Sequence, residues 1–127
     1  MAAEGTARTA NFLFPKNVGT GIFAWIILLS LILADLFLLD IFTTQLILNM
    51  GGIELNPLMA GVVTMPFLHI ILKIGIVILV IPVALNAEAR VKRSGIALYA
   101  ALIVMYAVVV LNNTTVLFPH ILGSFAV

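Results

Sequence analysis

The chain lacks cysteine and has few charged residues, and both absences limit what it can be. Without cysteine there is no disulfide, no thiolate metal site and no cysteine nucleophile. Charged residues make up 9% of the 127 residues, against roughly 25% in a soluble domain. Hydrophobic residues make up 64%, and the mean hydropathy is +1.30. No soluble fold of this size covers so much apolar surface, so the composition predicts an integral membrane protein in contact with the lipid bilayer.

Low net charge and low histidine content exclude further classes of protein. The formal net charge is +1, so no strong basic field attracts nucleic acid, and we expect no nucleic-acid partner. Two histidines cannot build a three-histidine metal site without carboxylates or a partner chain. The sequence therefore indicates no particular cofactor, no metal site and no catalytic residue.

Three long apolar runs predict an all-α fold with transmembrane helices at about residues 22–48, 62–85 and 96–118. The first run rises roughly 40 Å as a helix, which exceeds a hydrocarbon core of about 30 Å, so we expect it to be tilted or to extend past the interface. Pro119 is expected to end the third helix. Residues 20–127 form the transmembrane domain, and residues 1–19 form a polar tail that is either disordered or laid on a partner.

The basic residues predict the orientation of these helices. Arg8 and Lys16 lie in the tail, and Arg90, Lys92 and Arg93 lie between the second and third runs. The other loop and the C-terminus contain no lysine or arginine. Under the positive-inside rule, the N-terminus is cytoplasmic and the C-terminus is outside. We expect a multi-pass protein of the plasma membrane.

Ionisable side chains inside or at the ends of the runs are the most informative feature: Asp35, Asp40, Glu54, His69 and Lys73. A charge at the centre of the bilayer costs at least about 2.5–3.5 kcal/mol, so it needs a partner or a function. Asp40 and Lys73 fall at similar depths on adjacent antiparallel helices, which predicts a buried ion pair. Such a pair either fixes the helix register, contributes to an ion path or takes part in catalysis, in that order of preference.

Other polar residues fall near the same depth. Thr43 and Thr44 follow Asp40 by three and four residues, and His69 precedes Lys73 by four, so each shares a helix face with its neighbour. The predicted polar cluster, which is also a possible ion site, contains Asp40, Thr43, Thr44, Glu54, Asn56, His69, Lys73 and Asn113. For most of these residues a structural role is the simpler interpretation, and for Glu54 and Asn56 the alternative is a hard-cation site.

Asp35 does not belong to this cluster. It precedes Asp40 by five residues, which places it about 140° round the helix and nearer the middle of the bilayer. No residue of this chain is an evident partner for it. Asp35 therefore either faces another subunit or is protonated, and we interpret it as a partner-facing residue of a larger assembly.

The strings LDIFTT at residues 39–44 and GGIELNPLM at residues 51–59, followed by Lys73, carry a resemblance. They resemble an uncharacterised family of small archaeal and bacterial multi-pass membrane proteins, known as a domain of unknown function. Its pattern is Asp-x-x-Thr-Thr, then Glu-x-Asn-Pro, then a lysine in the next span, and the resemblance covers about residues 33–113. The resemblance implies no activity. It does imply that the residues matching the pattern act as one unit, and these are Asp40, Thr43, Thr44, Glu54, Asn56, Pro57 and Lys73.

Three hypotheses for function follow from these patterns. The first is an accessory subunit of a larger membrane protein complex, with other membrane subunits as partners. The second is a homo-oligomeric ion or proton conductor with Asp40, Glu54, His69 and Lys73 along its path and Asp35 continuing it inward. The third, an intramembrane enzyme, ranks last because the sequence offers neither a nucleophile beside a base nor three metal ligands.

Overall fold

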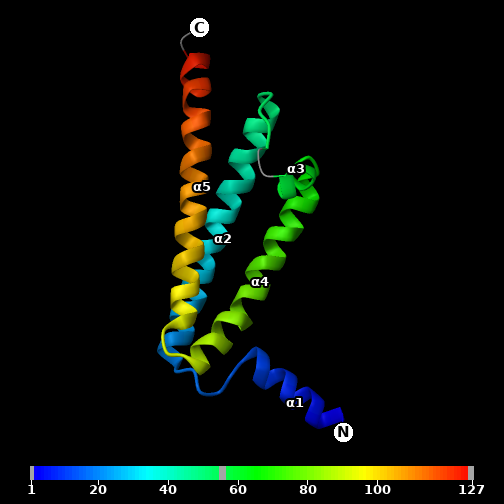
Figure 1. The fold of residues 1–127 in the computed structure, drawn as a ribbon, viewed down its shortest axis with the longest axis vertical. Helices are drawn as coiled ribbons and strands as arrows, with labels where there is room; N and C mark the ends of the chain where they lie inside the picture. Colours follow the sequence, from blue (N-terminus) through cyan, green and yellow to red (C-terminus); the bar gives the residue numbers. More distant parts are fainter. Residues whose placement is uncertain (1, 55–56, 126–127) are drawn as a thin grey trace.

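The computed structural model describes residues 2–54 and 57–125, and all regular structure in them is helical. The helices are α1 (Ala2–Leu13), α2 (Thr20–Asn49), α3 (Pro57–Val63), α4 (Pro66–Arg90) and α5 (Ser94–Phe125), as Figure 1 shows. Helices α2, α4 and α5 are each long and apolar enough to cross a membrane. The prediction of an all-α protein with three membrane-spanning helices is therefore confirmed.

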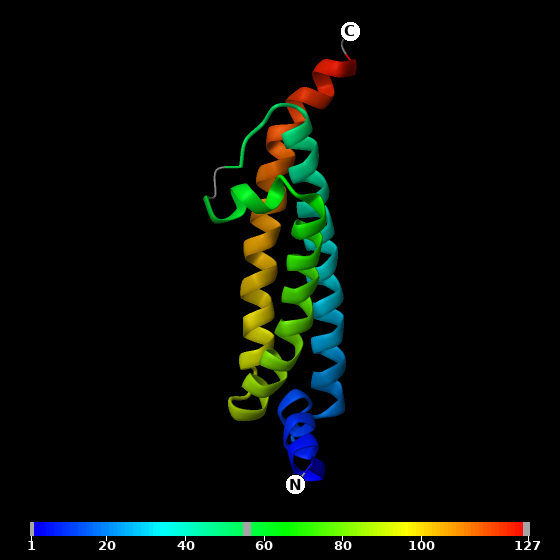
Figure 2. The same cartoon turned by 90° about the vertical axis from the view of Figure 1, so that its right-hand side faces the viewer.

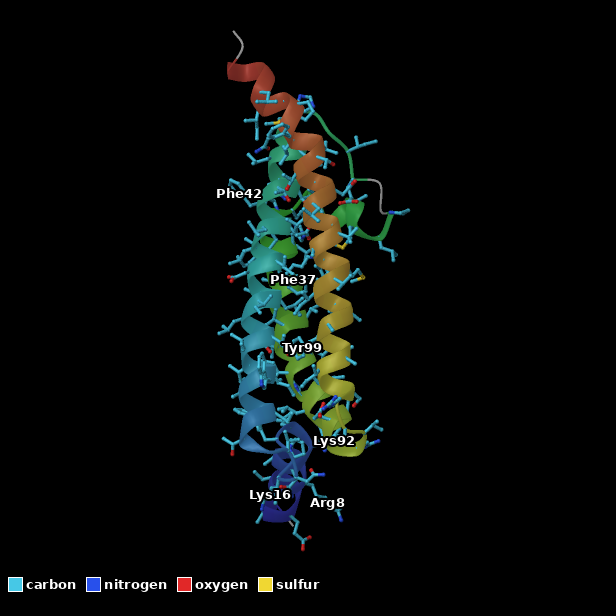
Figure 3. The ribbon with its side chains drawn as sticks, turned by 90° about the vertical axis from the view of Figure 1, so that its left-hand side faces the viewer. Arg8, Lys16, Phe37, Phe42, Lys92 and Tyr99 are labelled. Carbon is cyan, nitrogen blue, oxygen red and sulfur yellow. The ribbon has the colours of Figure 1, made fainter. Side chains whose placement is uncertain are left out.

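The three long helices form a bundle with two different ends. Helices α2 and α5 lie side by side, whereas α4 approaches both at one end and diverges from α5 toward the other (Figures 1 and 2). We call the first the basic end, because Arg90, Lys92 and Arg93 lie there beside the tail that carries Arg8 and Lys16 (Figure 3). The opposite end, which carries α3 and the C-terminus, is the α3 end.

The apolar core fills the half of the bundle nearer the basic end. Its buried residues are Ile26, Leu33, Phe37, Ala84, Leu85 and Tyr99. The hydroxyl of Tyr99 lies 2.5 Å from Ser30 Oγ, and Ser30 Oγ also donates to the carbonyl of Ile26 at 2.7 Å. The Ser30–Tyr99 hydrogen bond joins α2 to α5 and gives the buried phenol group a hydrogen-bond partner. Figure 3 shows Phe37 and Tyr99 among the helices, while Phe42 points outward.

A buried carboxylate closes the turn between α4 and α5. Glu88 Oε1 accepts the backbone N–H of Arg93 at 2.6 Å, and Glu88 Oε2 accepts that of Gly95 at 3.0 Å. These N–H groups belong to the start of α5, where a helix leaves donors unsatisfied and favours negative charge. Arg93 adopts a φ of 67°, a left-handed conformation that makes the turn short.

The tail is not the disordered segment that was one of the two expectations, because residues 2–13 form the helix α1. The tail contacts the end of α4 in the same chain. Asn86 Nδ2 donates to the carbonyl of Phe12, and Asn17 Nδ2 donates to the carbonyl of Ala89 at 3.0 Å. The two side-chain amides donate to carbonyls in the last turns of α1 and α4, where the backbone carbonyls of a helix have no intrahelical partner.

Helix boundaries differ from those of the apolar runs: α2 and α5 extend beyond their runs at both ends, whereas α4 begins later than the expected residue 62 because residues 57–63 form the separate helix α3. Helix α4 begins at Pro66, where a proline needs no N–H partner, and continues to Arg90 rather than ending near residue 85. Pro119 does not end α5, which continues to Phe125, so that prediction is wrong. A proline removes the hydrogen bond of its own N–H and bends the helix rather than stopping it, and Figure 2 shows the last turns of α5 at an angle.

The loop after α2 follows the predicted stop signal. Gly51 has a φ of +86°, and the N–H of Gly52 bonds the carbonyl of Ile47 at 2.9 Å. This left-handed glycine satisfies carbonyls in the last turn of α2. Pro57 then opens α3 as its first residue, as expected for the Asn-Pro step.

A substitution at Gly95 tests how closely α4 approaches α5. A Cβ at this position would meet the carbonyl of Ala84 and the Cβ of Glu88, so Gly95→Ala must push the helices apart. We expect Gly95→Ala to lower the free energy of unfolding by about 1–3 kcal/mol, measured by detergent-driven unfolding in mixed micelles.

Gly75→Ala is the matched control, because Gly75 also lies in a long helix and a Cβ there meets nothing within 4 Å. We expect this variant to be as stable as the parent or slightly more so, since alanine is the better helix former. Equal stability of the two variants would contradict the close packing at Gly95.

Candidate functional site

Buried polar side chains from all three long helices gather in the half of the bundle nearer the α3 end. We define the polar cluster as Asp40, Thr43 and Thr44 of α2, His69 and Lys73 of α4, and Asn113 of α5. Asp40 lies nine residues before the last residue of α2, and Lys73 lies seven residues after the first residue of α4. At 1.5 Å per residue both are roughly 10–14 Å from these helix ends, within the membrane-spanning segments.

The centre of the cluster is an ion pair between α2 and α4. Lys73 Nζ lies 2.8 Å from Asp40 Oδ2, and the two residues are 4% and 6% exposed. Charges taken out of water are tolerated only when they are paired and hydrogen-bonded. The pair expected from the two depths is thus present, and it sets the register of α2 against α4.

The second carboxylate oxygen of Asp40 connects to α5. Asn113 Nδ2 lies 3.3 Å from Asp40 Oδ1 and 3.0 Å from Thr43 Oγ1. Thr44 Oγ1 donates to Asp40 Oδ1 at 3.4 Å and accepts from Asn113 Nδ2 at 3.3 Å. Thr43 Oγ1 donates to the carbonyl of Leu39 at 2.8 Å. The cluster therefore links all three spans, with interhelical hydrogen bonds of the kind that hold membrane helices together.

Two aromatic rings enclose the ammonium group of Lys73. Its Nζ lies 4.2 Å from the ring centroid of Tyr106 and 4.7 Å from that of Phe37. The two rings meet edge to face with centroids 4.4 Å apart. Such cation–π contacts favour a desolvated ammonium and leave Lys73 held between its carboxylate and these rings.

His69 is buried, yet no group among the described residues forms a hydrogen bond with its imidazole. The residue is 1% exposed, and neither imidazole nitrogen has a hydrogen-bond partner within residues 2–54 and 57–125. Its Nε2 lies 4.0 Å from Asp40 Oδ2, too far for a hydrogen bond. An unpaired buried polar group costs free energy, and native proteins leave few of them.

A cavity of about 570 Å³ lies beside the cluster, between α4 and α5, with α2 behind it and α3 at one end. Asp40, Thr44, His69, Lys73 and Asn113 line it together with Glu54, Asn112, Tyr106 and apolar residues of α3 and α5. A second cavity of about 180 Å³ lies next to it, and Thr44, Glu54, Asn112 and Asn113 line both. Glu54, on the loop after α2, is therefore brought to the cluster as predicted from its position. Asn56 lies outside the described residues.

Asp35 lies apart from the polar cluster. It lies on the exposed surface of α2, and within the part of the chain that the structure describes it has no hydrogen bond or ion pair. Large exposed apolar side chains surround it on α2, including Leu31, Leu38 and Leu39.

Three contributors to the site were not recognised from the sequence. Phe37 and Tyr106 enclose Lys73, and Gln45 Nε2 donates to the carbonyl of Val63 at 2.8 Å, which holds the end of α3 near α2. Phe37 precedes Asp40 by three residues on one helix face, a spacing that is a usable signal. The position of Tyr106 depends on how α5 packs, so the sequence carries no comparable signal.

The chemistry that this arrangement supports is limited. Within the described residues, no group of three histidine, aspartate or glutamate side chains is close enough to hold a metal ion. The ion pair is already neutralised and enclosed. His69 is the member of the cluster whose side-chain nitrogens are both buried and without a hydrogen-bond partner among the described residues, so it has hydrogen-bonding capacity to offer to a bound molecule.

Comparison with known proteins identifies a family and no activity. The sequence profile of a family described as a domain of unknown function (DUF5658) matches residues 31–119. The matched segment contains Asp35 and the whole polar cluster, and it leaves out α1 and the start of α2. Neither the curated proteins nor the solved structures contain a match to this chain.

The ion pair predicts a non-additive loss of stability. Lys73→Met leaves Asp40 buried without a counter-charge, so we expect the free energy of unfolding in mixed micelles to fall by about 3–5 kcal/mol. The double variant Asp40→Asn with Lys73→Met removes both charges, and we expect it to lose less than the sum of the single variants. Lys92→Met, at an exposed position of the α4–α5 turn, is the control. A loss for Lys73→Met no larger than for this control would contradict a stabilising pair.

Proposed function

The chain belongs to the DUF5658 family, and we propose that it is an accessory subunit of a larger membrane protein complex. In this proposal, the α2 surface around Asp35 packs against a helix of a different membrane protein. That partner helix presents a hydrogen-bond donor or a basic side chain to Asp35. The polar cluster holds the three spans of this chain in register while α2 makes the contact.

The observation that carries the proposal is the exposed carboxyl group of Asp35. Residue 35 is 15 residues after the first residue of α2 and 14 before the last, so it lies at the middle of a membrane-spanning helix. A charged side chain there costs about 2.5–3.5 kcal/mol when it faces lipid alone. Intramembrane carboxyl groups instead face a bundle interior and pair with a neighbouring group. Within the described chain no side chain is paired with Asp35, which supports a neighbour supplied by a second chain.

The conducting alternative is less well supported. Asp40, Glu54, His69 and Lys73 line one cavity near the α3 end, which resembles the entrance of a path. Below them, however, Leu33, Ala84, Leu85 and Tyr99 fill the interior toward the basic end. A path would therefore run between copies of the chain, along the surface that carries Asp35. Proton or ion flux in liposomes that is lost in Asp40→Asn would favour this alternative.

We further propose that the basic end faces the cytoplasm of a plasma membrane. The basic residues Arg8, Lys16, Arg90, Lys92 and Arg93 all belong to this end, and the described part of the α3 end carries none. This asymmetry is the determinant of orientation in short loops. The N-terminus is then cytoplasmic and the C-terminus is outside.

The orientation predicts which sites an impermeant reagent reaches. The chain has no cysteine, and Gly5 and Gly123 lie near opposite ends with open space around them. We expect Gly123→Cys to react with a membrane-impermeant maleimide in intact cells and Gly5→Cys to react only after permeabilisation. The reverse pattern would contradict a cytoplasmic N-terminus.

The subunit proposal predicts loss of assembly when Asp35 is replaced. We expect the tagged chain, gently solubilised from its own membranes, to run as a complex with a defined second protein. We expect Asp35→Leu to fold but to bind that partner about 5- to 30-fold more weakly, since an intramembrane polar contact contributes about 1–2 kcal/mol.

Leu38→Ala is the control for this experiment, because Leu38 is exposed on the same helix and carries no charge. We expect this variant to retain its partner. Purification of a homo-oligomer alone, or full partner retention in Asp35→Leu, would contradict the proposal.

A further inference from the structure

The buried imidazole of His69 and the cavity beside it point to a ligand site that lies within one chain. His69 lines the cavity of about 570 Å³, and neither of its nitrogens is satisfied by the described protein groups. The volume falls in the range of about 300–1,000 Å³ that small-molecule sites occupy. A ligand that hydrogen-bonds His69 would remove the cost of leaving it unpaired.

The walls of the cavity differ in polarity. Polar residues of α2 and α4, including Asp40, His69 and Lys73, form one side. The apolar lining comes from Met105, Val108 and Val109 of α5 with Met59 and Val63 of α3, and Asn112 and Asn113 of α5 add polar groups closer to the α3 end. A molecule that fills this space is therefore amphiphilic, with a polar group toward α4 and a hydrocarbon body along α5.

The cavity reaches the lipid-facing surface of the bundle. Met105 and Val108 line it and are 50% and 60% exposed, respectively. His69 is the fourth residue of α4, so it lies only about 5 Å along the helix from its first residue. A membrane-dissolved molecule can therefore enter from the side, between α4 and α5.

The charges around the cavity disfavour an anionic ligand. Asp40 and Glu54 are formally negative, and Lys73 is the one cationic side chain in the lining. Lys73 is already 2.8 Å from Asp40 and enclosed by two rings, so it has little attraction left for a phosphate or a carboxylate. The polar group of the ligand is therefore not an anion.

The hydrogen-bonding capacity of His69 matches a hydroxyl group. A neutral imidazole has one donor nitrogen and one acceptor nitrogen, and a hydroxyl group both donates and accepts. We propose that this cavity binds a lipid alcohol, an uncharged amphiphile whose hydroxyl group bonds His69 and whose hydrocarbon body lies against α5. The class includes long-chain alcohols and acylglycerols with a free hydroxyl group.

Histidine-selective ¹⁵N labelling tests the proposal directly, because the chain contains only His69 and His120. The full chain is placed in phosphatidylcholine nanodiscs and titrated with 1-dodecanol or with dioleoylglycerol. We expect a saturable shift of the His69 side-chain resonances and no shift for His120, which is exposed near the end of α5. We expect dodecane and dodecanoate to leave both histidines unchanged.

A labelling experiment locates the molecule. Dodecanol with a diazirine on its chain is expected to crosslink peptides that contain Met59, Met105 or Val108 after illumination. We expect His69→Leu to reduce this labelling about fivefold, since it removes one hydrogen bond, and His120→Leu to leave it unchanged. Val109→Trp, which fills the cavity from the apolar wall, is expected to abolish it.

Three results would overturn the proposal. The first is the absence of a His69 shift with either alcohol, which leaves water as the partner of the imidazole. The second is an equal shift with dodecane, which removes the role of the hydroxyl group. The third is crosslinking that is unchanged in both His69→Leu and Val109→Trp.

Discussion

The ion pair between Asp40 and Lys73 is the constraint on which the rest of this structure depends. Each charge lies within a membrane-spanning helix, where neither is tolerated alone, so α2 and α4 must place the two at the same height. The remaining carboxylate oxygen then requires a donor, and Asn113 brings α5 to that height. Two aromatic rings complete the shell of Lys73. One pair of charges thus sets the register of three apolar helices, whose hydrophobic surfaces alone would not define it.

The two halves of the bundle are held by different forces. At the basic end, the helices meet through an apolar core and the Ser30–Tyr99 hydrogen bond. The carboxylate of Glu88 adds hydrogen bonds from backbone N–H groups at the start of α5. At the α3 end, polar side chains join the helices, and space remains between α4 and α5. The half with less apolar packing is the half that contains the cavity, because close packing and an accessible cavity exclude each other.

The general plan of the protein was readable from its sequence because hydrophobicity alone defines membrane spans. The stop at Gly51 and the pairing of Asp40 with Lys73 were also readable, since each follows from a local rule or a count of depth. The extension of α4 past residue 85 could not be predicted from the sequence, because polar residues such as Asn86 and Glu88 are typical of loops. In the structure, Asn86 donates to the backbone carbonyl of Pro82, and Glu88 accepts the backbone N–H of Gly95. Likewise, the helix continues through Pro119.

The parts of the site that the sequence did not predict depend on packing between helices. Spacing along one helix relates Thr43 and Thr44 to Asp40, but it cannot bring Tyr106 of α5 over Lys73 of α4. It also cannot reveal that His69 is buried without a partner, since that requires knowing every group around it. Residue type and depth therefore identified most members of the cluster, and three-dimensional packing decided which of them remain available.

The divergence of α4 from α5 has a mechanical consequence. A bundle that is narrow at the basic end and broader at the α3 end occupies unequal areas in the two leaflets of a bilayer (Figure 1). Lateral pressure in the leaflet at the α3 end therefore acts on a wider cross-section than lateral pressure at the basic end, where the short turn held by Glu88 joins α4 to α5.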